Sequence, residues 1–271
     1  MSGAFLLFRL SLKRFWPLLC ATGLLLATVQ ALRVLLAASI HSAGEFDQLT
    51  AMLPSFMHDL VGPSLASIMT FNGIVCGAYF DTGFIIALLA LAIALATLPA
   101  SEIETGFADL ILARPVPRHW LVTRTIALVL LSILLMLLMI MVGTWAGLAT
   151  FAPPDAPWPT ARQTLALALT LGMLITCWSG IAMALGAACR RGVASAATSL
   201  LAFAALLLDG AHRLWPPLDC IAWLSPFSYF NPYELVAGGP LQVENLLVLG
   251  AIAATGYTVA YLIISQRDIS R

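Results

Sequence analysis

The chain has 271 residues, of which 61% are hydrophobic and only 10% are charged. Soluble domains carry about 25% charged residues, so a water-soluble core cannot hold this much apolar surface and lipid is the expected solvent. Its 13 basic residues balance its 13 acidic residues, and this zero net charge argues against the basic surface of a nucleic-acid-binding protein.

The N-terminal stretch 1–15, MSGAFLLFRLSLKRF, places Arg9, Lys13 and Arg14 among apolar residues. This pattern predicts a short interfacial helix lying on the membrane surface. A charged beginning of the first membrane span fits the same residues equally well. A cleavable signal peptide is not predicted, because the basic residues precede an apolar run of full length with no small-residue cleavage site.

Six apolar runs have about the 20 residues that a helix needs to cross a bilayer core. The stretch 64–99 is too long for one span, since as a single helix it would rise about 54 Å, and too short for two. We therefore assign 64–75 to an outer, partly interfacial segment. The expected fold is all-α, a polytopic membrane protein with one transmembrane domain over 1–271. The predicted spans lie near 16–38, 76–99, 125–150, 163–188, 193–209 and 245–265.

The distribution of Lys and Arg predicts the orientation in the membrane. An even number of spans puts both termini on one side, and most of the 13 basic residues fall on that side. The termini are therefore expected to be cytoplasmic, in the cell (inner) membrane. The residues on that side are Arg9, Lys13, Arg14, Arg114, Arg118, Arg124, Arg190, Arg191, Arg267 and Arg271, against Arg33, Arg162 and Arg213 on the other.

The predicted extracytoplasmic connections are the segments 39–63, 151–162 and 210–244. The first and last are long and are expected to contain short amphipathic pieces, whereas 151–162 is a proline-rich turn. The last is full of Trp, Tyr and Phe, residues that settle at the headgroup level of a bilayer. Two interpretations stay open: an aromatic belt, or a cap over an exit path.

The segment 100–118 between the second and third spans is longer than a simple connection requires. Ser101 and Glu104 have the spacing of a capping box directly after Pro99, which predicts that a helix begins there. Pro115 and Pro117 would end it after about three turns. We predict an amphipathic helix on the cytoplasmic surface, with one apolar stripe made by Ile103, Phe107, Leu110 and Ile111.

The order Glu-x-Glu-x-Gly-x-x-acid-x-apolar-Leu-x-Arg-Pro-Val-x-Arg, from Glu102 to Arg118, resembles the loop after the second span in permeases of type-two ATP-binding-cassette (ABC) exporters. The segments Ser225–Pro232 (SPFSYFNP) and Ser265–Ile269 (SQRDI) are similar to two further features of that family, so the likeness covers nearly the whole chain. The chain departs from the pattern at three positions, which blurs any subfamily assignment: Phe107 replaces a common Thr, Asp109 a Glu, and Pro117 a Ser or Thr.

The resemblance implies a membrane subunit without enzymatic activity or cofactors of its own. A separate ABC ATPase would bind ATP and Mg²⁺ and receive the cytoplasmic coupling helix in a groove, and a second permease subunit, identical or not, would complete the path. The alternative is that the charges only solvate a cytoplasmic loop. The residues expected to bind the partner are Glu102, Glu104, Gly106, Phe107, Leu110, Arg114, Pro115 and Arg118.

The sequence offers little catalytic chemistry. It has no Gly-x-x-x-x-Gly-Lys-[Ser/Thr] phosphate loop, its only lysine is Lys13, and its histidines and five cysteines lack metal-ligand spacing. Its composition suits an amphipathic or hydrophobic cargo. Two other functions stay open: a related permease in metal-centre maturation or signalling, and an intramembrane enzyme that uses Asp81 and Asp209.

Three charged residues inside the spans are the remaining candidates. Counted from the cytoplasmic ends at 1.5 Å per residue, Arg33 and Asp209 lie about 24 Å and Asp81 about 27 Å along their helices. We hypothesise that they line the outer mouth of a translocation path, with Arg33 paired to one acid; snorkelling to the interface is the alternative. The pairs Gly73/Gly77 and Gly143/Gly147 have a spacing that lets helices approach closely.

Overall fold

A computed structural model of the chain describes residues 2–43, 70–105, 120–154, 156–214, 217 and 219–266, and every regular element within them is helical. The elements are α1 (Ser2–Ala43), α5 (Phe71–Cys76), the 3₁₀ turn η2 (Gly77–Tyr79), α6 (Thr82–Ala96), α7 (Leu98–Glu104), α9 (Trp120–Phe151), α10 (Ala161–Ala188), α11 (Arg191–Leu214), α12 (Asp219–Ala222), the 3₁₀ turn η4 (Pro226–Tyr229), α13 (Pro232–Val236) and α14 (Val243–Gln266).

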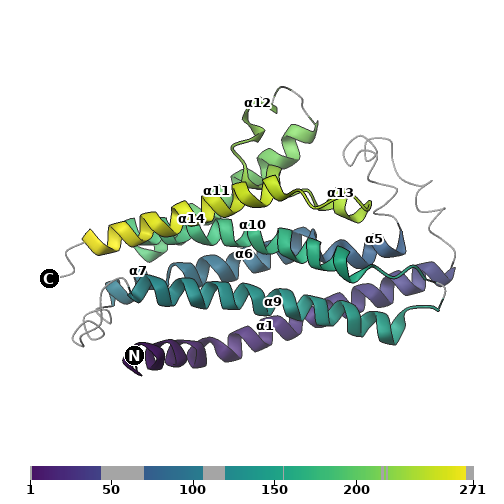
Figure 1. Ribbon diagram of the computed structural model, residues 1–271, viewed down its shortest axis with the longest axis horizontal. Helices are drawn as coiled ribbons and strands as arrows, with labels where there is room; N and C mark the ends of the chain where they lie inside the picture. Colours follow the sequence, from purple (N-terminus) through teal and green to yellow (C-terminus); the bar gives the residue numbers. More distant parts are fainter. Residues whose placement is uncertain are drawn as a thin grey trace.

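Six helical segments are long and apolar enough to cross a membrane, which confirms the six predicted spans. The chain therefore has the architecture of a multi-pass membrane protein. The beginning of α1 and the end of α14 lie at the same end of the bundle, here called the terminal end (Figure 1). α9 packs along α1, whereas α10 lies centrally and contacts α6, α9, α11 and α14. The short helix α12 stands out from the side of the bundle (Figure 1).

The first helix is continuous through Pro17, so a separate interfacial helix over 1–15 is not confirmed. α1 contains 42 residues and would be about 63 Å long, roughly twice the thickness of a bilayer core. Pro17 is the one local residue that disfavours a helix at this point, and α1 nevertheless continues through it. The second interpretation, a charged beginning of the first span, fits this helix.

The second span is an interrupted helix. Its described part begins at Phe71 rather than near 76 as predicted, because α5 packs against α1 as part of the bundle; residues 64–69 lie outside the described ranges. The helical path breaks at Phe80 and Asp81, and α6 begins at the next residue. Asp81 has an extended backbone, and its Oδ1 accepts the N–H groups of Gly83 and Phe84 at 2.8 and 3.4 Å. Asp81 is therefore the N-cap of α6.

A buried glutamine joins three helices near the break. Gln30 of α1 is fully buried, and its Nε2 donates to the Val75 carbonyl of α5 at 2.8 Å and to Thr144 Oγ1 of α9 at 3.0 Å. A buried amide group is costly in an apolar environment unless it is hydrogen-bonded. Gln30 therefore connects α1 to α5 and α9, and the sequence pattern alone gave no sign of its role.

The predicted capping box is wrong in its placement. α7 begins at Leu98, with Thr97 at the cap position and Pro99 in the first turn, so Ser101 lies inside the helix. Proline fits the first turn of a helix because the N–H that it lacks would have no intrahelical partner there. α7 ends at Glu104, and the remainder of the predicted coupling helix, from Gly106 onwards, lies outside the described residues.

Small residues bring two helix pairs into backbone contact, and the first of these contacts is at the predicted Gly143/Gly147 pair. A Cβ atom added to Gly143 of α9 would lie 2.4 Å from the Ala27 carbonyl oxygen of α1. A Cβ atom added to Gly180 of α10 would lie 2.7 Å from the Ala253 carbonyl oxygen of α14. Close approach of this kind increases van der Waals contact between membrane helices, which lack a hydrophobic driving force in lipid.

The segment between α12 and α14 folds back into the bundle. Phe227 and Phe230 are buried, whereas Trp223 is 65% exposed. Ser225 Oγ donates to the Ala205 carbonyl of α11 at 3.0 Å. Ala205 lies about 21 Å along α11 from its first residue, which is less than the roughly 30 Å thickness of a bilayer core. The segment therefore enters the depth of the bundle, and the predicted 210–244 loop is shorter than expected because α11 continues to Leu214.

Candidate functional site

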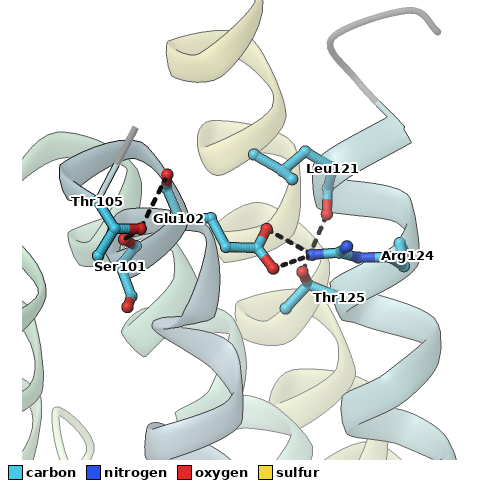
Figure 2. A network of polar contacts seen from close by, with 6 residues as sticks. All are labelled: Ser101, Glu102, Thr105, Leu121, Arg124 and Thr125. Atoms are coloured by element: carbon cyan, nitrogen blue, oxygen red, sulfur yellow. Dashed lines mark hydrogen bonds and ion pairs between the residues drawn. The ribbon is translucent and has the colours of Figure 1, made fainter. Parts of the chain in front are cut away.

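A buried ion pair joins the second and third spans at the terminal end. Glu102 of α7 points at Arg124 of α9, and Arg124 Nη2 lies 2.5 Å from the carboxylate (Figure 2). The Arg124 side chain is 4% exposed and that of Glu102 is 15% exposed. Thr125, on the same turn of α9, is also buried and donates to the Leu121 carbonyl at 2.9 Å. Removing either partner of such a pair leaves a buried charge without its counter-ion, so the two residues are required together.

A second link connects α7 to the fifth span. The carboxylate of Glu104 accepts the backbone N–H of Arg191 at 2.6 Å, at the first residue of α11. Arg191 Nη1 also donates to Ser101 Oγ at 3.3 Å. A negative charge is favourable at a helix N-terminus, where backbone N–H groups lack intrahelical partners. The short helix α7 is thus tied to both α9 and α11.

These links change the interpretation of two predicted partner-binding residues. Glu102 and Glu104 are engaged within the chain, where they fix the position of α7. The chain leaves the described region just after α7 and re-enters it at Trp120, one turn before Arg124, so the Glu102–Arg124 pair holds together the two ends of the segment 106–119. The other predicted residues, Gly106, Phe107, Leu110, Arg114, Pro115 and Arg118, lie outside the described part of the chain.

At the opposite end of the bundle, Arg33 pairs with Asp81. Arg33 Nη2 lies 2.6 Å from Asp81 Oδ2, and the guanidinium also lies over the Phe84 ring, 5.7 Å from its centroid. A Cβ atom on Gly77 would lie 2.7 Å from Arg33 Nη1, so this glycine makes room for the guanidinium. The hypothesis that Arg33 pairs with one of the two acids is confirmed.

Asp81 has two separable structural roles, as an ion-pair partner and as the cap of α6. Replacing Asp81 with Asn keeps a cap acceptor and removes the charge, whereas Ala removes both. We expect Asp81→Ala to lower the free energy of unfolding by about 1 kcal/mol more than Asp81→Asn does. Unfolding by SDS titration in mixed micelles measures this difference. Equal losses in the two variants would contradict the capping role.

The third candidate, Asp209, lies on a cavity wall between α6 and α11. The cavity has a volume of about 290 Å³ and is also lined by Thr82, the neighbour of Asp81. The predicted common level of the acids along the bundle is therefore consistent with the structure. The acids face different surroundings, because Thr82 and Ile85 line this cavity whereas Phe84 lies under Arg33.

A second cavity continues the first towards the terminal end. It has a volume of about 190 Å³ and shares Leu206 and Phe227 with the first. Its walls are Ile86, Leu89, Ala90 and Ile93 of α6 and Ser199, Ala202 and Phe203 of α11. Phe227 comes from the segment that folds back into the bundle, and its ring lies 5.8 Å from that of Trp178 on α10. Sequence reasoning missed this residue's position, since aromatic residues near a span end also suit a surface belt.

The arrangement gives little support to acid–base chemistry between Asp81 and Asp209. Carboxylate pairs that share a proton lie about 3 Å apart, but both Asp81 oxygens already have partners, Arg33 on one side and two N–H groups on the other. Within the described ranges, no three His, Cys, Asp or Glu residues are grouped closely enough to hold a metal ion.

Comparison with known proteins identifies no relative, so a function has to be inferred from the sequence, the fold and the site. No protein-family model matches the chain, and no curated protein is significantly similar to it in sequence.

Proposed function

We propose that the chain is the membrane subunit of an ATP-driven exporter of the ABC type. It acts as a single permease domain in the cell membrane, with both termini cytoplasmic, and moves an amphipathic or hydrophobic cargo. A separate ATPase subunit binds and hydrolyses ATP, and a second permease subunit completes the path. The cytoplasmic side corresponds to the terminal end of the bundle.

The observation that carries this proposal is the combination of the Glu102–Arg118 motif with its anchoring. The motif resembles the coupling helix of type-two ABC exporters, and the Glu102–Arg124 pair holds the ends of the segment together. Amphipathic helices commonly dock into grooves on a partner. A segment anchored at both ends transmits a push from its partner into the bundle, whereas a loosely attached loop would absorb it.

The contacts of α7 indicate which helices would respond. α7 follows α6 with only Thr97 between them, and Glu104 holds the N-terminus of α11. A displacement of α7 therefore acts on both walls of the α6–α11 cavity. In this mechanism, closure of the ATPase subunits pushes the coupling segment, and the tilt of α6 against α11 changes access to the cavity.

Exposed apolar residues on α1, α11 and α14 offer a surface for the two other proposed partners, the bilayer lipid and the second permease subunit. Side chains such as Leu24, Leu25, Leu200, Phe203 and Leu247 are more than half exposed. Many exposed large apolar side chains of this kind are covered by lipid or by another protein. They provide the surface on which bilayer lipid and the second permease subunit would lie.

Co-purification with an ATPase tests the proposal. The tagged wild-type chain, extracted from its native membrane in mild detergent, is expected to retain a phosphate-loop ATPase identified by nucleotide photolabelling. Phe107→Ala and Arg114→Ala are expected to release it, because they remove an apolar anchor and a charge from the docking surface. The matched control is Arg162→Ala, at the opposite end of the bundle, which is expected to leave the complex intact. Retention of the ATPase by both coupling-segment variants would refute the docking assignment.

A further inference from the structure

We propose that the α6–α11 cavity binds an amphipathic cation, with its head group against Asp209 and its apolar tail along the second cavity. This inference names the cargo class of the proposed exporter and so rests on that function for its physiological meaning. The binding site itself is argued from the cavity alone.

The chemistry of the first cavity suits a cationic head group. Asp209 is the only acidic or basic residue among the described residues that line it. The other walls include four aromatic side chains, Phe80, Phe227, Phe230 and Tyr233. The faces of aromatic rings attract cations, and a desolvated contact of this kind contributes about 2 kcal/mol. A carboxylate surrounded by aromatic rings is therefore a site for an ammonium group.

The aromatic walls are held in place by packing. The rings of Phe80 and Tyr233 lie 5.3 Å apart in an edge-on arrangement, which joins the break before α6 to α13. Phe227 and Phe230 are 3% and 7% exposed and belong to the segment that Ser225 anchors to α11. Because these contacts hold the walls in place without a ligand, less entropy is lost on binding.

The second cavity suits the tail of the same molecule. It continues directly from the first and is lined by apolar side chains, with Ser199 as the exception. From Ser199 to Asp209, α11 rises about 15 Å. A ligand lying along this path would place its charge beside Asp209 and its chain between α6 and α11. An anionic amphiphile of the same shape would meet the carboxylate and be rejected.

Photolabelling of the purified subunit in lipid nanodiscs tests the inference. The probe is dodecyltrimethylammonium with a diazirine near the end of its tail, and the control probe has the same tail with a sulfonate head group. The cationic probe is expected to label the peptides containing Ile86–Ile93 or Ser199–Leu206, and unlabelled dodecyltrimethylammonium should compete. The sulfonate probe should label these peptides at least tenfold less. Equal labelling by both probes would overturn the inference.

Variants connect the binding to particular residues. Asp209→Asn is expected to weaken competition by dodecyltrimethylammonium at least tenfold, whereas Glu244→Gln removes an exposed acid of α14 outside the cavity and should change nothing. Phe80 lies on a partly exposed wall, and Phe80→Leu is expected to weaken competition by dodecyltrimethylammonium several-fold. This variant replaces Asp209→Asn as the test if Asp209→Asn fails to fold. The inference would be overturned if folded Asp209→Asn showed unchanged competition by dodecyltrimethylammonium. The same holds for Phe80→Leu if it is the variant tested.

The experiment separates this inference from the proposed function, because labelling needs no ATPase. Cation-selective labelling without a co-purifying ATPase would leave the binding site standing and refute the exporter assignment. A co-purifying ATPase without cation-selective labelling would refute only the cargo class.

Discussion

Arg124→Met is expected to lower the free energy of unfolding by about 3–5 kcal/mol, the usual effect of removing one partner from a buried ion pair. The variant leaves the Glu102 carboxylate facing apolar surroundings without its cation, at a position where only 15% of that side chain is exposed. Met fills similar space along the arginine stem, so lost packing contributes little. The measurement is SDS-induced unfolding of the purified protein in mixed micelles.

A double-mutant cycle isolates the ion pair from other effects. Arg124→Met combined with Glu102→Leu is expected to recover most of the lost stability, because no unpaired charge remains in the pair. Arg162→Met serves as the control: Arg162 is exposed at the start of α10, and its replacement should change the stability by less than about 0.5 kcal/mol. If the double variant is as unstable as Arg124→Met, the pair is not what joins α7 to α9.

Gly143→Ala is the second substitution expected to have a large effect. Its new methyl group would lie 2.4 Å from the Ala27 carbonyl oxygen, and backbone atoms cannot move aside without separating α1 from α9. Overpacking of this kind costs about 1–3 kcal/mol, and here it acts along the interface of two whole helices. Thermal unfolding followed by circular dichroism in detergent measures the loss.

Gly192→Ala is the matched control for the crossing of α1 and α9. Gly192 lies in α11, and a Cβ atom added there would meet nothing within 4 Å. Alanine also favours a helix over glycine by up to about 1 kcal/mol. This control should therefore be neutral or slightly stabilising, and a similar loss in both variants would mean that the α1–α9 approach is not limited by sterics.

The six spans and the heights of Arg33, Asp81 and Asp209 along their helices were predictable. Both depend only on the sequence nearby, through the length of an apolar run and the number of residues along a helix. A run of about 20 apolar residues specifies a crossing helix wherever the helix later packs. Counting residues along the predicted spans placed Arg33 at a height similar to those of Asp81 and Asp209, which predicted a pair with one of the two acids but did not identify Asp81 as the partner. The small-residue spacing at Gly143 likewise identified a helix contact, although it did not identify α1 as the partner.

Features that depend on packing between distant segments were not predictable. Glu102 was expected to face another protein, because nothing in its surroundings along the chain indicates that Arg124 lies across from it. Ser101 and Glu104 match a capping box, but the same spacing occurs inside helices, and Pro99 moved the beginning of α7 to Leu98. The buried position of Gln30 depends on its contacts with α5 and α9, and that of Phe227 depends on the segment that re-enters the bundle.

The account depends most directly on contact between the segment 106–118 and a motor subunit. The decisive measurement is the amount of ATPase that co-purifies per permease subunit, in the wild type and in the Phe107→Ala and Arg114→Ala variants. The account predicts a fixed ratio for the wild type and for the Arg162→Ala control, and a loss of most of the ATPase in the other two. A folded wild-type subunit that transports its cargo without any ATPase, or variants that retain the full ratio, would contradict it.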